Sequence, residues 1–108
     1  MRSVLLEFSM FPTDQGESKS KYVSQVIKNI KDSGLNYQLT AMGTIVEFDN
    51  IDDALKLIKS SYETLENLGC NRVYSVLKFD IRNNKENRLK TKIEAVEKQI
   101  GEVNKGSN

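Results

Sequence analysis

The chain has 108 residues, of which 38% are hydrophobic and 29% are charged, and its formal net charge is +1. These values predict one soluble domain with one core, and they give no overall field that would attract nucleic acid or an anionic membrane. The chain has no histidine and one cysteine, Cys70. Histidine-based catalysis and an internal disulfide are therefore excluded, and no metal site is expected from one thiol and carboxylates.

The first half of the chain predicts a strand followed by a helix. Apolar residues alternate over residues 3–11, which is the period of a strand, and Pro12 ends the pattern. Apolar residues then recur at helical spacing, with Ser18 as the expected N-cap and Gly34 after the last turn.

The second half predicts three more strands and two more helices. The expected strands cover residues 36–41, 44–48 and 72–81. The expected helices cover about residues 51–68 and 86–100. Asn50 is the expected N-cap of the earlier helix, and Gly69 and Gly101 are the expected helix ends. We therefore expect a single domain over residues 1–101 and a flexible tail over 102–108.

The order β-α-β-β-α-β is that of the ferredoxin-like split arrangement, an α+β fold with an antiparallel sheet and two helices on one face. The first and third strands are then central, and the second and fourth lie at the edges. The more apolar side of each strand should face the helices. The residues assigned to this core are Val4, Leu6, Phe8, Met10, Val46, Phe48, Leu77 and Phe79.

On the opposite, open face of the expected sheet, the two central strands carry the carboxylates Glu7 and Glu47 among apolar residues. A solvated sheet face usually carries fewer large apolar side chains, so we expect the last helix, another subunit or both to cover it. A covered carboxylate needs a partner, because an unpaired buried charge is costly. The partner is either a protein group such as Lys78 or a cationic small molecule, which Ser9 and Thr44 would help to bind.

Several blocks of the sequence resemble the small thiamine-binding protein family. These blocks are Glu7-Phe8-Ser9-Met10-Phe11-Pro12, Gly16-Glu17-Ser18, Met42-Gly43-Thr44 with Glu47, and Lys78, Asp80 and Arg82. The resemblance runs from about Ser3 to about Ile100 and includes the order and spacing of the blocks. It implies a ferredoxin-like subunit that dimerises through its sheet, often forms tetramers, and binds thiamine or related pyrimidine compounds without known catalysis.

The resemblance also suggests which residues contact the ligand. The thiazolium ring of thiamine is a permanent cation suited to carboxylates and aromatic rings, and its aminopyrimidine needs hydrogen-bond donors and acceptors. The expected ligand contacts are Glu7, Ser9, Phe11, Gly43, Thr44 and Glu47. Lys78 and Asp80 are expected either to contact the ligand or to form a structural pair across a subunit interface.

Two other classes of function stay open. The chain is alternatively a structural or regulatory homo-oligomeric module without a small-molecule ligand, and an enzyme using carboxylates is the least favoured reading. RNA binding on such a sheet needs exposed aromatic residues where Glu7 and Glu47 stand, so no nucleic-acid partner is expected. The basic residues from Arg82 to Lys98 alternate with glutamates, which indicates a solvated helix face.

The remaining expectations concern Cys70 and the cellular compartment. Cys70 follows a helix end and is expected to be a small buried residue rather than a nucleophile. A single thiol, no signal-peptide pattern and no run of roughly 20 apolar residues favour a cytoplasmic protein with no membrane partner.

Overall fold

The computed structural model describes residues 2–17 and 19–105, so the expected N-cap Ser18 lies outside the described residues. Three helices and four strands follow one another in the expected order. They are β1 (Arg2–Pro12), α1 (Ser20–Asp32), β2 (Asn36–Thr40), β3 (Gly43–Phe48), α2 (Ile51–Asn67), β4 (Val73–Asn83) and α3 (Arg88–Ile100).

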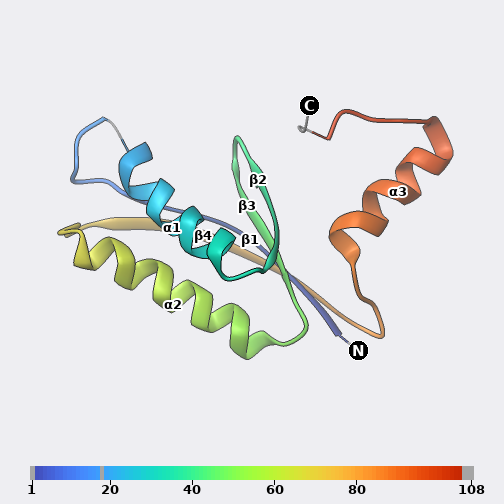
Figure 1. Cartoon of the computed structure of the whole chain (residues 1–108), viewed down its shortest axis with the longest axis horizontal. Helices are drawn as coiled ribbons and strands as arrows, with labels where there is room; N and C mark the ends of the chain where they lie inside the picture. The colour runs from blue at the N-terminus through green and yellow to red at the C-terminus, as the bar shows by residue number, and fades with distance from the viewer. Residues whose placement is uncertain (1, 18, 106–108) are drawn as a thin grey trace.

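The four strands form one antiparallel sheet in the order β2-β3-β1-β4. Helices α1 and α2 lie side by side against one face, whereas α3 stands apart from them and contacts β1 and β2 (Figure 1). This arrangement confirms the ferredoxin-like α+β fold, with β1 and β3 in the centre of the sheet.

Local signals at the helix ends agree with this arrangement. The Asn50 side chain caps α2, because its Oδ1 accepts the Asp53 backbone N–H at 2.8 Å. Gly34 and Gly101 follow α1 and α3 with φ of +78° and +88°, a conformation that favours glycine. Beyond Gly101, the Glu97 carboxylate accepts from the Val103 N–H and the Lys105 ammonium, so the tail folds back toward α3.

The core lies between the sheet and the helices α1 and α2. Six of the eight predicted sheet residues are buried in it, namely Val4, Leu6, Phe8, Met10, Val46 and Phe48. The prediction for Leu77 and Phe79 is wrong, since these side chains are 41% and 38% exposed. They share a face with Phe8 and Leu6, their neighbours on β1, but α1 and α2 pack mainly over β1 and β3 and leave the edge strand β4 uncovered.

The strand register places charged residues of three strands on the open face. Glu7 on β1 lies opposite Lys78 on β4, and Leu5 lies opposite both Glu47 on β3 and Asp80 on β4. Directly opposed residues of antiparallel strands point to the same side. The two glutamates therefore occupy the same face of adjacent central strands, as predicted.

Candidate functional site

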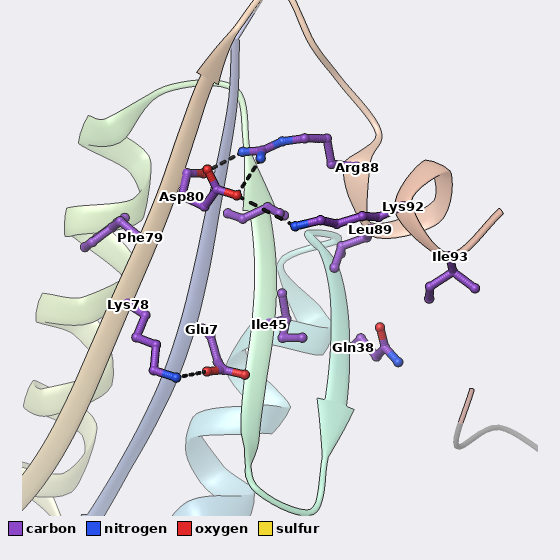
Figure 2. Close-up of a pocket in the computed structure, with 11 residues that line it drawn as sticks. Glu7, Gln38, Ile45, Lys78, Phe79, Asp80, Arg88, Leu89, Lys92 and Ile93 are labelled. Atoms are coloured by element: carbon purple, nitrogen blue, oxygen red, sulfur yellow. Dashed lines mark hydrogen bonds and ion pairs between the residues drawn. The ribbon is translucent and has the colours of Figure 1, made fainter. Parts of the chain in front are cut away.

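A pocket of about 380 Å³ lies between the open face of the sheet and α3, and we call it the α3 pocket (Figure 2). Its apolar lining comes from both elements and consists of Leu5, Ile45, Leu89 and Ile93, and Phe79 borders it from β4 while its ring lies on the helix side of the sheet. Its polar lining carries both signs of charge and consists of Glu7, Gln38, Lys78, Asp80, Arg88 and Lys92. The expectation that the last helix covers part of the open face is thus confirmed.

Glu7 lies in this pocket with a lysine as its partner. Lys78 Nζ is 3.3 Å from Glu7 Oε1, and the two side chains are 72% and 42% exposed (Figure 2). An exposed ion pair of this kind contributes about 0–1 kcal/mol. Glu7 is therefore held only weakly by Lys78, and its carboxylate stays accessible to a small molecule.

Glu47 has a different environment, because it caps α3. Its Oε2 accepts the Arg88 backbone N–H at 2.8 Å, and its Oε1 accepts the Leu89 N–H at 3.2 Å. The residue before the helix, Asn87, has φ of 57° and makes no side-chain cap. A carboxylate on β3 thus satisfies free N–H groups of a helix that begins 41 residues later, and its charge suits the positive end of the helix.

The Arg88 side chain completes this attachment. It is 8% exposed, and it donates from Nε to Ser3 Oγ at 2.8 Å and from Nη1 to Asp80 Oδ2 at 2.9 Å. It also donates to the backbone carbonyls of Ser3 and Asp80. Ser3, itself buried, donates its hydroxyl to Glu47. We call Ser3, Glu47, Asp80 and Arg88 the α3 clamp.

The clamp changes the protonation of Glu47. Burial acts to raise the pKa of this carboxyl, but hydrogen bonds from Ser3, Arg88 and Leu89 and the charge of Arg88 outweigh it and lower the pKa below its usual value. Glu47 is consequently ionised at neutral pH and already fully engaged by protein groups.

The other predicted site residues lie elsewhere. Ser9, Phe11, Gly43 and Thr44 line a second pocket of about 310 Å³ beside α1 and the β2–β3 turn. Thr44 is buried and lies opposite Phe8, on the helix-covered face, because it is one residue out of phase with Glu7 and Glu47. The structure therefore does not bring the six expected ligand contacts into one site.

Two residues of this second pocket, Phe11 and Gly43, lie close to other parts of the protein. The Phe11 ring centroid is 5.6 Å from that of Tyr74 and 5.2 Å from Lys19 Nζ. A Cβ added at Gly43 would lie 3.1 Å from the Phe8 carbonyl oxygen, so a side chain there would press on β1. Gly43 thus allows β3 to approach β1 closely.

Sequence reasoning missed Gln38, Lys92 and above all Arg88, which it assigned to a solvated helix face. That prediction is wrong for Arg88, because its side chain is buried against Ser3. The pattern of charges along the helix does not reveal a contact between opposite ends of the chain. The apolar stripe of the last helix did indicate a packed surface. Its residues Leu89 and Ile93 line the α3 pocket, as that pattern suggests.

Three further features bear on the function: metal-binding groups, membrane-spanning helices and the thiol of Cys70. Over residues 2–17 and 19–105, no group of three or more His, Cys, Asp or Glu side chains could hold a metal ion. In the same ranges, no helix has the length and apolar character needed to span a membrane. Cys70 is buried, as predicted, and burial, followed by the nearby charge of Asp14, raises the pKa of its thiol.

Comparison with known proteins gives a consistent relationship. A family model described as thiamine-binding protein matches residues 6–97. The UPF0045 protein MJ1052 of Methanocaldococcus jannaschii is 41% identical over 96 residues, which cover 89% of this chain and 94% of the relative. The crystal structure of MJ1052 matches with a TM-score of 0.77 at 40% identity and covers 89% of this chain and 97% of that one.

A more distant structure supports the fold alone. It is that of a Thermotoga maritima protein provisionally assigned to thiamine biosynthesis or salvage, with a TM-score of 0.64 at 19% identity, covering 83% of this chain and 96% of that one. The family match spans most of the chain, and the fold and the carboxylates on the central strands agree with the resemblance seen in the sequence. The chain belongs to the thiamine-binding protein family.

Proposed function

We propose that this protein binds thiamine or a related pyrimidine or thiazole compound in the α3 pocket, without catalysis. The observation that carries the proposal is the combination of apolar walls with the accessible carboxylate of Glu7 in one concave site. Small-molecule sites are typically apolar clefts with a few directed polar groups. Family membership supports thiamine as the class of ligand.

Each part of thiamine has a suitable group in the pocket. The thiazolium cation would lie near Glu7 and replace the ammonium of Lys78, which is 72% exposed and free to move into water. The aminopyrimidine would pack on Leu5 and Ile45 and use the Gln38 amide, which offers both donors and an acceptor. Glu47 would act indirectly, by holding α3 in place as one wall.

We further propose that the protein acts as a homo-oligomer, a dimer or a tetramer, in the cytoplasm. The exposed apolar residues of β4 support self-association. A reducing compartment fits a chain whose single cysteine, Cys70, is a free thiol.

Isothermal titration with thiamine tests the ligand. We expect binding to the wild type and a roughly fivefold to tenfold weaker Kd for Glu7→Gln, since this variant removes one partly exposed charge pair but keeps the shape of the side chain. Glu63→Gln, on the exposed side of α2, is the matched control and should bind like the wild type. Equal Kd values for Glu7→Gln and Glu63→Gln would contradict the placement of the cation.

The second candidate is an assembly module without a small-molecule ligand. It is favoured by the finding that both glutamates already have protein partners, Lys78 for Glu7 and the α3 backbone for Glu47. No heat with thiamine or hydroxymethylpyrimidine, at protein concentrations well above micromolar, would reject the ligand proposal and leave this alternative.

A further inference from the structure

A further pocket adjoins the α3 pocket, and we call it the β4–α3 pocket. It has a volume of about 360 Å³ and lies between the end of β4, the loop that follows it and the adjoining face of α3. Four of the seven residues that line it are cationic and one is acidic, and the cations are Arg82, Lys85, Arg88 and Lys92. A chain with a formal net charge of +1 thus concentrates positive charge in one hollow.

The fold gathers these cations from three segments. Arg82 follows Asp80 by two residues on β4, so both belong to the open face of the sheet. Arg88 and Lys92 are four residues apart on α3 and share one face of that helix. Lys85 comes from the loop between the strand and the helix. Because α3 is fixed by the clamp, the cations are held around one space.

Two of the four cations have no carboxylate partner. Arg88 and Lys92 share Asp80, whose Oδ2 lies 2.9 Å from Arg88 Nη1 and 3.9 Å from Lys92 Nζ. Neither Arg82 nor Lys85 forms an ion pair with any residue in the portion of the chain that the structure describes. The pocket therefore holds more positive charge than its own carboxylate balances.

The glutamates that alternate with these basic residues along the chain lie elsewhere in space. Glu86 lines a different pocket, beside Glu47. Glu97 accepts hydrogen bonds from the Val103 N–H and the Lys105 ammonium. Neither Glu86 nor Glu97 lines the β4–α3 pocket. A charge pattern that looks balanced along the sequence is consequently unbalanced in the folded protein.

The two neighbouring pockets share a group of lining residues. Asp80, Arg88 and Lys92 line both the α3 pocket and the β4–α3 pocket. Figure 2 shows this group at one end of the α3 pocket and Glu7 with Lys78 at the other end. A ligand that places a cation at Glu7 and extends along the pocket thus meets positive charge at its far end.

We propose that the β4–α3 pocket binds the phosphate group of a ligand whose ring lies in the α3 pocket, so that the preferred ligand is a phosphate ester of thiamine or of a related pyrimidine or thiazole compound. This inference rests on the proposed function, since it takes the ring to lie near Glu7. A phosphate monoester carries a charge of about −1.5 to −2 and three acceptor oxygens at neutral pH. Arg82 would bind it with two parallel donors, and Lys85 and Lys92 with one donor each. The Thr91 hydroxyl adds a neutral donor.

The spacing along β4 fits this placement. Arg82 lies four residues beyond Lys78, the neighbour of Glu7, which is about 13 Å along the strand. The ethyl phosphate arm of a thiamine ester covers part of this span, and the long side chains of Arg82 and Lys85 cover the rest. A ligand without the phosphate does not reach these cations, so they distinguish the ester from the free alcohol.

A polyanion such as a nucleic acid fits this pocket less well. Nucleic-acid recognition uses cations spread along a stripe or over a broad face. The cations here converge on one hollow, on a chain with a formal net charge of +1. The geometry therefore favours a single small anion.

Isothermal titration of the wild type with thiamine and with thiamine monophosphate measures the preference. We expect the monophosphate to bind roughly tenfold or more tightly at low ionic strength, because it adds charge-assisted hydrogen bonds. Arg82→Gln and Lys85→Gln should each reduce this ratio roughly threefold or more while keeping the wild-type Kd for thiamine. Lys59→Gln is the matched control, because it removes an exposed charge from α2, on the opposite side of the sheet, and should keep the wild-type ratio.

Inorganic pyrophosphate tests the pocket without a ring. In ¹H–¹⁵N NMR spectra of the wild type, millimolar pyrophosphate should shift the backbone amides of Lys85, Thr91 and Lys92 but not that of Ile45, which lines only the ring-binding part. Lys85→Gln should weaken this binding roughly threefold or more, since it removes one charged donor.

The outcomes separate this inference from the ligand proposal. Equal Kd values for thiamine and its monophosphate, or the same ratio in Lys85→Gln as in Lys59→Gln, would overturn the phosphate site and leave thiamine binding intact. Localised pyrophosphate shifts without any heat from thiamine would retain the phosphate site and reject the ligand proposal. Amides of the β4–α3 pocket that respond neither to pyrophosphate nor to thiamine monophosphate would overturn the phosphate site, whatever the result with thiamine.

Discussion

The two glutamates of the open face occupy equivalent places in the sequence pattern and different places in the molecule. Glu7 is partly exposed in the α3 pocket and faces the exposed ammonium of Lys78. Glu47, on the adjacent strand, accepts hydrogen bonds from Ser3, Arg88 and Leu89 and fixes the start of α3. One carboxylate is available to a ligand, and the other builds the wall of the pocket that would hold it.

The difference shows that covering a sheet face divides its polar groups into two kinds. Glu47 lies at the start of α3 and accepts hydrogen bonds from backbone N–H groups, which are fixed in the helix. Glu7 lies in the pocket beside α3, and a ligand could replace its lysine partner. Three changes to the protein would break or sharpen this contrast.

Arg88→Ala should have the largest effect. It removes a buried cation and leaves the Asp80 carboxylate and the Ser3 hydroxyl and carbonyl oxygens without their charged donor, which costs about 3 kcal/mol. Urea unfolding and hydrogen exchange over residues 88–100 measure the global and the local part of this loss. Lys92→Ala is the control, because this exposed ammonium lies 3.9 Å from Asp80 and should contribute little. Unchanged exchange over α3 in Arg88→Ala would contradict the clamp.

Glu47→Ala should cost about 2 kcal/mol, because two helix N–H groups and the Ser3 hydroxyl lose their acceptor. The matched change Glu7→Ala should cost less than about 1 kcal/mol, since only an exposed ion pair is lost. The same urea titration compares the two variants. Equal losses would mean that the two carboxylates contribute equally to the stability of the fold.

Lowering the pH should change the free energy of unfolding less than these substitutions do, because a protonated Glu47 still accepts a hydrogen bond. The clamp lowers the pKa of Glu47 in the folded state, so the unfolded chain binds more protons at acidic pH. The stabilisation from ionised Glu47 is therefore present above its usual value of 4.5 and is lost as pH falls through the folded pKa. The free energy of unfolding of Glu47→Gln should fall less steeply than that of the wild type below that value; parallel pH profiles would refute the linkage.

Much of the fold followed from the sequence because its signals are local. Alternation over β1 and β3 set the buried residues of both strands, and Asn50 and Gly34 marked helix ends through their own conformational preferences. The order of the elements then left few topologies open. The error at Leu77 and Phe79 arose because alternation identifies a face of a strand but not how far the helices extend over it.

The candidate site was predicted only in part. Strand phase correctly put Glu7 and Glu47 on one face, yet Thr44 points to the other face and Glu47 caps a helix. The attachment of Arg88 to Ser3 joins residues 85 positions apart, and no spacing rule reports such a contact.

By itself, the sequence determined the element order, the two faces of the sheet and the family, because periodicity, caps and motif blocks are written along the chain. Only the tertiary structure decided which glutamate has an exposed lysine as its partner and which is engaged by the start of a helix. That outcome depends on where α3 lies, and α3 is positioned by buried hydrogen bonds between distant segments. The exposure of β4, likewise, depends on how far two helices reach across a sheet.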